Sequence, residues 1–146
     1  MSTNKAIYEA QIRQLIDGWA KALRAKDINV LMSYYTPDIV LFDLPPPLEY
    51  RGADAYRKNW EEWLPSFQGP VGYEIRDLSI TTGDDVAFCH SLNRISGTRT
   101  KGEETDVWVR ATVGFRKIDG KWMITHEHLS VPFDMETNQA LFDLKP

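Results

Sequence analysis

Two stretches near the C-terminus decide the fold. Residues 105–117 read TDVWVRATVGFRK, and residues 121–131 read KWMITHEHLSV. Apolar and polar side chains alternate in both, which is typical of β-strands that have two different faces. Asp119 and Gly120 stand between them and favour a tight turn. The two stretches therefore predict an antiparallel hairpin.

The register of this hairpin decides which side chains share a face. A regular two-residue turn would set Phe115 opposite Ile124 and Arg110 opposite Leu129. One face then carries Trp108, Arg110, Thr112, Thr125, Glu127 and Leu129, and the other carries Val109, Ala111, Val113, Phe115, Trp122, Ile124, His126 and His128. A bulge would exchange the two faces, because a slip of one residue moves every side chain to the other side. Both registers remain open.

The pattern upstream of the hairpin changes from strands to helices. Residues 73–80 and 86–96 alternate with period two, so four strands follow one another. Residues 4–25 and 52–67 have helical periodicity, and Asp27 can cap a short helix that Pro37 would end. An early strand is predicted over 39–44, before the loop of three prolines at 45–47. This order predicts an α+β fold.

Size and composition exclude several classes of protein. A chain of 146 residues suits one domain over 1–133, followed by an acidic, weakly patterned tail over 134–146. The net charge of -4 and the lack of a basic block argue against nucleic acid as a partner. Cys89 is the single cysteine, and no leader-like or membrane-spanning apolar run is present. We expect a cytoplasmic protein with no membrane association.

Several short motifs, in this order, carry a family resemblance. They are WAKALRAKD at 19–27, YTPDI at 35–39, YRG at 50–52, DGKWMI at 119–124 and HEHLS at 126–130. Their order and spacing resemble the NTF2-like superfamily, and in particular its SnoaL-like and ketosteroid isomerase-like members. The resemblance implies a cone, in which three N-terminal helices pack on a strongly curved, mixed but mostly antiparallel sheet. Such a cone would enclose a pocket for a small organic molecule.

Asp43 is the first candidate for a catalytic residue. In the early strand it follows Ile39 and Leu41 on an otherwise apolar face, where a carboxylate is costly and its pKa would rise. The resemblance places the general base of ketosteroid isomerase at this point of the strand. The alternative is a structural aspartate that caps the proline loop.

The resemblance also implies which other residues face the pocket. By their spacing from Asp43, Trp19 and Trp60 occupy positions at which the isomerase has tyrosines. Both would then line the pocket, and the alternative is that they only pack in the hydrophobic core. It implies that the face with His90 and Arg94 lines the pocket, which would pair His90 with Asp43 for proton transfer. On the hairpin it implies that the face with Trp108, Arg110 and Glu127 lines the pocket, whereas a bulge would bring in His126 and His128.

Arg94 and Arg110 would suit an anionic group on the ligand. His126 and His128 have the spacing of a metal pair, but no third ligand can be placed, so we predict no metal. No phosphate loop, nucleotide fingerprint or nucleophile motif is present, so we predict no cofactor.

Two functions follow as hypotheses. The first is an isomerase, cyclase or dehydratase that uses a pocket carboxylate for proton transfer on an apolar carbonyl or ring compound. It would not be a true ketosteroid isomerase, because the two donors to the enolate are replaced. The alternative is a non-catalytic ligand-binding or association domain, like that of calcium/calmodulin-dependent kinases. A homodimer through the open sheet face is expected in either case, since Val109, Val113, Phe115, Trp122 and Ile124 would otherwise be exposed there.

Overall fold

The C-terminal hairpin forms as the sequence predicts. In the structure, a computed structural model that describes residues 2–146 and the side chains of residues 4–146, strands β5 (Glu104–Ile118) and β6 (Lys121–Ser130) pair antiparallel. Asp119 and Gly120 connect them with φ values of 51° and 79°, which is the left-handed backbone that a tight hairpin turn requires.

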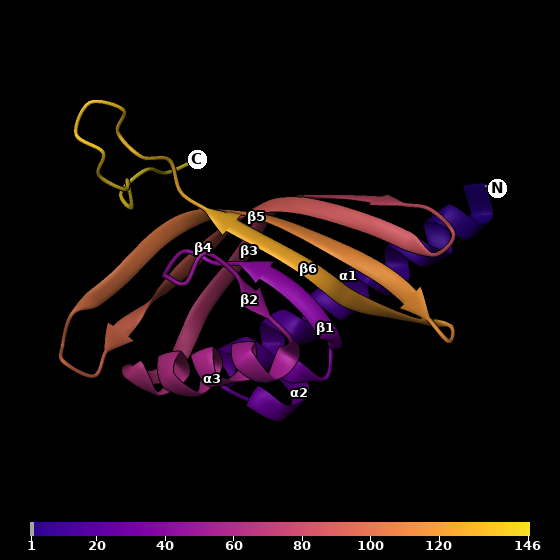
Figure 1. The fold of residues 1–146 in the computed structure, drawn as a ribbon, viewed down its shortest axis with the longest axis horizontal. Coiled ribbons are helices and arrows are strands. Elements are labelled where there is room, and N and C mark those ends of the chain that lie inside the picture. Colours follow the sequence, from indigo (N-terminus) through magenta and orange to yellow (C-terminus); the bar gives the residue numbers. More distant parts are fainter. Residues whose placement is uncertain (1) are drawn as a thin grey trace.

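Four further strands extend the hairpin into a mixed sheet of six (Figure 1). On one side β4 (Val86–Arg99) pairs antiparallel with β5, and β3 (Phe67–Thr82) pairs antiparallel with β4. On the other side β1 (Tyr35–Phe42) runs parallel to β6, and the short β2 (Tyr50–Arg51) covers the outer edge of β1. The resulting order is β2-β1-β6-β5-β4-β3, which agrees with the predicted α+β fold.

Strand β1 differs from its prediction. It begins at Tyr35 rather than at residue 39, and it contains Pro37, which was expected to end a helix. Pairing with β6 is interrupted between Tyr35 and Val40, so the missing N–H of the proline breaks no ladder bond there. The strand ends at Phe42, which leaves Asp43 as the first residue after it.

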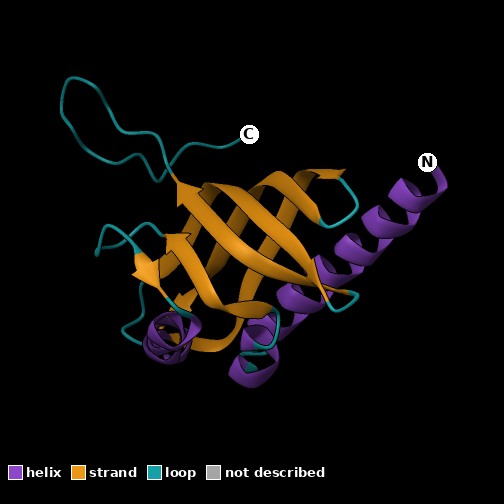
Figure 2. Cartoon of the chain, turned by 45° about the vertical axis from the view of Figure 1, so that its right-hand side comes forward, coloured by secondary structure: helices purple, strands orange, loops and turns teal. Residues whose placement is uncertain are grey.

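The helices follow their predicted amphipathic patterns. Helix α1 (Ser2–Arg24) buries Ile12, Ile16 and Leu23, and it packs mainly against β3 across one face of the sheet (Figure 2). Asp27 caps the short α2 (Ile28–Met32) by accepting from the backbone N–H of Val30 at 3.2 Å.

Helix α3 (Ala53–Trp63) and the 3-10 turn η1 (Leu64–Ser66) lead into β3. Within the described chain, residues 2–146, no helix combines the length and the apolar character that crossing a membrane requires.

Irregularities in the ladders curve the sheet. Register shifts interrupt β3 against β4 between Gln68 and Gly72 and between Arg76 and Ser79, and β5 against β6 at Thr125. A bulge bends the strand that carries it and increases the local twist. The curved sheet and α1 therefore enclose a space that α3 closes from the side.

Candidate functional site

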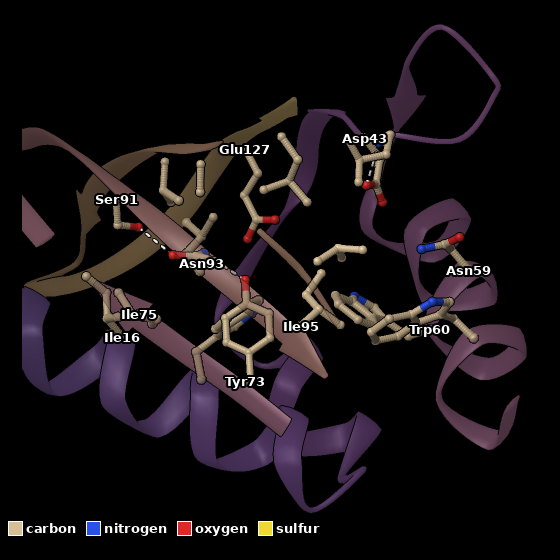
Figure 3. A pocket seen from close by; sticks show the side chains of 18 of the residues that line it. Ile16, Asp43, Asn59, Trp60, Tyr73, Ile75, Ser91, Asn93, Ile95 and Glu127 are labelled. Atoms are coloured by element: carbon tan, nitrogen blue, oxygen red, sulfur yellow. Dashed lines mark hydrogen bonds between the residues drawn. The ribbon is translucent and has the colours of Figure 1, made fainter. Parts of the chain in front are cut away.

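A cavity of about 270 Å³ lies between the concave face of the sheet, α1 and α3. Its wall is mostly aliphatic and aromatic, with Trp19 from α1 and Trp60 from α3 among the rings, as the sequence predicts. Few polar side chains interrupt this wall, and Arg99 and Thr105 are two of them. Figure 3 shows others that point inward from α3, β3, β4, β6 and the position after β1. They are Asp43, Asn59, Tyr73, Ser91, Asn93 and Glu127. Such a concave apolar site with a small number of polar groups is typical of small-molecule binding.

Glu127 is the most deeply buried carboxyl group in this cavity, with 5% of its surface exposed. It points inward from β6, where it lies opposite Val113 of β5 and Leu41 of β1. Burial raises its pKa to about 8, and the charge of Asp43 adds to the increase, whereas a hydrogen bond with Tyr35 opposes it. Glu127 therefore carries a proton at neutral pH.

Tyr35 holds Glu127 in place through a buried hydrogen-bond relay. The indole N–H of Trp19 donates to the hydroxyl oxygen of Tyr35 at 2.8 Å, and Tyr35 in turn hydrogen-bonds the Glu127 carboxyl group. Burial and the nearby charge of Glu127 raise the pKa of Tyr35 well above its usual value, so the phenol stays protonated. The relay links α1, β1 and β6 at the wall of the cavity.

Asp43 faces the same cavity in a different environment. It stands two residues after Leu41, which pairs with Glu127, so both carboxyl groups lie on the concave face. Asp43 accepts hydrogen bonds from the backbone N–H of Leu44 at 2.7 Å and from the hydroxyl of Tyr56 at 3.1 Å. Burial raises its pKa, and these two bonds to the ionised form oppose that increase.

Tyr73 also presents its phenol to the cavity. Its oxygen accepts from Asn93 Nδ2 at 2.7 Å, and Asn93 Oδ1 accepts from the Ser91 hydroxyl at 2.7 Å. Since the amide already donates to it, the Tyr73 proton is directed elsewhere, and no acceptor for it is found among the described residues. Tyr73 is therefore a donor available to a bound molecule.

The buried indole N–H of Trp60, also in the cavity wall, has no hydrogen-bond partner among residues 4–146 either. An unpaired buried donor costs free energy that an acceptor on a ligand would recover.

The predicted place of His90 is wrong. His90 and Arg94 point to the convex face of β4, away from the cavity, and Arg94 forms an ion pair with Asp106 at 2.8 Å. The opposite face of β4 lines the cavity with Cys89, Ser91, Asn93 and Ile95. Both faces of this strand mix apolar and polar residues, so alternation alone could not choose between them. The pairing of His90 with Asp43 therefore does not occur.

The hairpin divides its predicted pocket residues. Phe115 pairs with Ile124, and its neighbour Gly114 pairs with His126, so Thr125 is an extra residue that forms a bulge in β6. As a result Glu127 faces the cavity as predicted, but Trp108 and Arg110 of β5 lie on the convex face, where Arg110 hydrogen-bonds Ser130 at 3.0 Å. The residues expected to be exposed for dimer contact are inside instead, namely Val109, Val113, Phe115, Trp122 and Ile124.

His126 and His128 stay on the convex face, where both rings pack edge-on against Phe42. The expectation that a bulge would bring His126 and His128 into the pocket is therefore wrong. In the part of the chain that the structure describes, no three His, Cys, Asp or Glu side chains cluster as a metal site would require.

Sequence reasoning missed several residues in or next to the site. Tyr35 was assigned to a helix, although it shares the inward face of β1 with Ile39 and Leu41. Tyr56 lies on the same face of α3 as Trp60, and this spacing could have placed it in the wall. Tyr73 and its partner Asn93 come from neighbouring strands, so only the register reveals that they meet.

The cone-shaped sheet, the helix across its concave face and the enclosed cavity define an α+β protein of the NTF2-like class. The SnoaL-like domain model matches residues 12–134, and the chain belongs to this family. None of the curated proteins matches the chain.

Solved structures support this assignment. An NTF2-like protein of unknown function from Pseudomonas putida KT2440 is 42% identical, with 97% of this chain and 98% of that chain covered and a TM-score of 0.88. A candidate scytalone dehydratase from Novosphingobium aromaticivorans shares the fold at 17% identity, with 100% and 99% coverage and a TM-score of 0.83. A candidate calcium/calmodulin-dependent protein kinase II association domain from Xanthomonas campestris has 22% identity, 91% and 87% coverage and a TM-score of 0.72.

Proposed function

We propose that the cavity binds a small, mostly apolar carbonyl or ring compound and transfers a proton on it through Asp43 and Glu127. The observation that carries this proposal is Glu127, a carboxyl group buried in an apolar cavity with a pKa of about 8. A buried acid that titrates near neutral pH and touches an open cavity is suited to proton transfer. The candidate dehydratase in the same fold supports this reaction class by analogy alone.

The two carboxyl groups have different environments, which supports different roles. Asp43 accepts hydrogen bonds from Leu44 and Tyr56, which favour its ionised form against the burial that raises its pKa, and we assign it the role of the base. Glu127 remains protonated at pH 7 and acts as the acid. Two carboxyl groups in different environments can divide the acid and base roles between them.

The proposed step forms an enol. Asp43 removes a proton from the carbon next to the carbonyl group, and the electron pair moves onto the carbonyl oxygen. That oxygen accepts the proton of Glu127 or a hydrogen bond from Tyr73, whose donor is free. Return of the proton from Asp43 to another carbon, with return of the enol proton to Glu127, completes an isomerisation. In a dehydration, Asp43 instead gives its proton to a hydroxyl group on the next carbon, which leaves as water, while the enol proton returns to Glu127 and the carbonyl group re-forms.

Hydrogen–deuterium exchange tests this step without knowledge of the natural substrate. We would incubate 1-tetralone, a small apolar cyclic ketone, with the protein in D₂O and follow deuterium at carbon 2 by NMR. The wild type should exceed buffer alone, and Asp43→Asn and Glu127→Gln should each reduce the rate by about 10²-fold. Asp17→Asn, an exposed carboxyl on α1, is the matched control and should leave the rate unchanged.

A binding protein without catalysis is the second candidate. Thermal shift with 1-tetralone separates the two, because binding by the wild type without exchange above buffer would favour it. Exchange that both variants retain at the wild-type rate would also overturn the acid–base roles.

Assembly into a homodimer remains a separate proposal. It is supported by the convex sheet face, where the ring of Phe88 is 47% exposed. Light scattering of the wild type and Phe88→Glu would test it, and a monomeric wild type would rule it out.

A further inference from the structure

The segment after β6 turns back toward the cavity. Phe133 and Ala140 form an isolated antiparallel bridge, and the Asp134 carboxylate between them accepts two backbone N–H groups at 2.8 and 3.1 Å. The backbone N–H of Leu141 then donates to the carbonyl oxygen of Pro132 at 2.8 Å, which closes the loop. Figure 1 shows this loop leaving the end of β6 and the chain returning toward the body of the molecule. The last residues are therefore set at the cavity mouth by a defined turn.

Phe142 is the residue of this segment that reaches the cavity. Its ring is part of the cavity wall, to which Thr105 and Val107 of β5 also contribute, yet 46% of its surface is exposed. An aromatic ring that lines a cavity while half of it faces solvent has apolar area left to cover. A ligand inside the cavity would cover part of that area.

A charge interaction brings the last residues near the start of β5. Asp106 has a lowered pKa, mainly because Arg94 hydrogen-bonds it, and the positive charge of Lys145 contributes to the decrease. Lys145 therefore lies near enough to Asp106, at the start of β5, for their charges to interact.

We propose that Phe142 is a specificity-determining residue, whose ring forms the outer wall of the cavity and limits the length of the ligand that the cavity holds. This inference rests on the proposed ligand binding, but it does not depend on the acid–base step. A ligand that fits behind the ring is released only when Phe142 moves aside. A ligand with a longer chain must displace the ring in order to bind.

Two fluorescent ketones that differ only in chain length test this proposal. They are 6-propionyl-2-(dimethylamino)naphthalene and its dodecanoyl homologue, whose emission shifts to the blue in apolar surroundings. Stopped-flow dilution measures their dissociation rates from the full-length wild type, Phe142→Ala and Leu144→Ala. Leu144 is the matched control, because it lies two residues further on and is similarly exposed, at 48%, but does not line the cavity.

Phe142→Ala should increase the dissociation rate of the propionyl probe by about tenfold, which is the effect of losing part of one buried ring. It should also strengthen binding of the dodecanoyl probe relative to the propionyl probe, whereas Leu144→Ala should change neither quantity.

Equal rates and equal selectivity in the wild type and Phe142→Ala, with the probe bound by both, would overturn the role of Phe142 and leave the acid–base proposal intact. An emission that the wild type does not change would overturn the inference together with the ligand site on which it rests. If the wild type binds the probes as expected but shows no deuterium exchange above buffer, only the acid–base proposal is overturned.

Discussion

The indole N–H of Trp19 donates to the hydroxyl oxygen of Tyr35 across 2.8 Å in the protein interior. Because the phenol oxygen already accepts this bond, its own proton is directed to Glu127. A residue of the first helix thereby fixes the orientation of a carboxyl group on the last strand. The contact spans nearly the whole sequence through one intermediate side chain.

Tyr35→Phe should raise the pKa of Glu127 further above 8. The Tyr35 hydroxyl stabilises the ionised carboxylate, so its removal leaves burial and the charge of Asp43 less opposed. Carbon-13 NMR titration of the labelled glutamate carboxyl group would measure the change. Tyr34→Phe alters the neighbouring phenol outside the relay, so it should leave the pKa of Glu127 unchanged. A lower pKa of Glu127 in Tyr35→Phe would contradict the relay.

The free energy of unfolding should decrease as the pH rises from about 4.5 to about 8. Over this range the unfolded chain releases the Glu127 proton, because its pKa is 4.5 there, whereas the folded chain keeps it until about 8. Glu127 contributes nothing below the lower value, since both states are protonated. Above the higher value the folded state carries the full cost of the buried charge, on the order of 5 kcal/mol.

Glu127→Gln should remove this decrease. Urea unfolding at pH 5 and pH 9 would compare the two proteins, and the glutamine variant should lose less stability between these values than the wild type. An identical pH dependence would mean that Glu127 titrates normally in the folded state.

His90→Gln should change neither ligand affinity nor deuterium exchange. The imidazole lies on the convex face, opposite Ser79 and Thr112, and is separated from Asp43 by the sheet. Isothermal titration with 1-tetralone and the exchange assay would check this expectation. A loss of exchange similar to that of Asp43→Asn would mean that β4 presents its other face to the cavity.

Gly97→Ala should lower the free energy of unfolding by about 2–3 kcal/mol. A Cβ atom there would lie 2.9 Å from Cδ1 of Phe67, which is buried, and the backbone has a φ of 149°. Gly69→Ala is the control, because its φ is also positive, at 64°, but nothing lies within 4 Å of its Cβ atom. Its cost should be about 1 kcal/mol of backbone strain, and equal costs in both variants would exclude the clash.

Local pattern was sufficient to predict the α+β fold and part of the site. The Asp27 cap, the buried stripe of α1 and the turn at Asp119 and Gly120 each depend on a few adjacent residues, so the sequence reveals them directly. Asp43 could be placed for the same reason, because two apolar neighbours at alternate positions define its face.

Properties that depend on pairing between strands could not be predicted. The bulge at Thr125 is one extra residue on β6, and it decides that Glu127 faces inward together with Val113 rather than with Thr112. Polar Ser91 and Asn93 are tolerated inside because they hydrogen-bond each other and Tyr73, whereas the family resemblance implied that the opposite face of β4 lines the pocket. Such compensation becomes visible only when both partners are in place.

The distribution of the indoles gives the cavity its own optical signal. Trp19, Trp60 and Trp63 border the space in which a ligand would lie. The ring centre of Trp60 lies 6.5 Å from that of Trp19 and 5.6 Å from that of Trp63. Trp108 and Trp122 lie outside it. A molecule that contacts the first three rings would change their emission directly, whereas Trp108 and Trp122 would have no such contact. Entry of an unlabelled molecule can therefore be followed in the native chain by its intrinsic ultraviolet fluorescence.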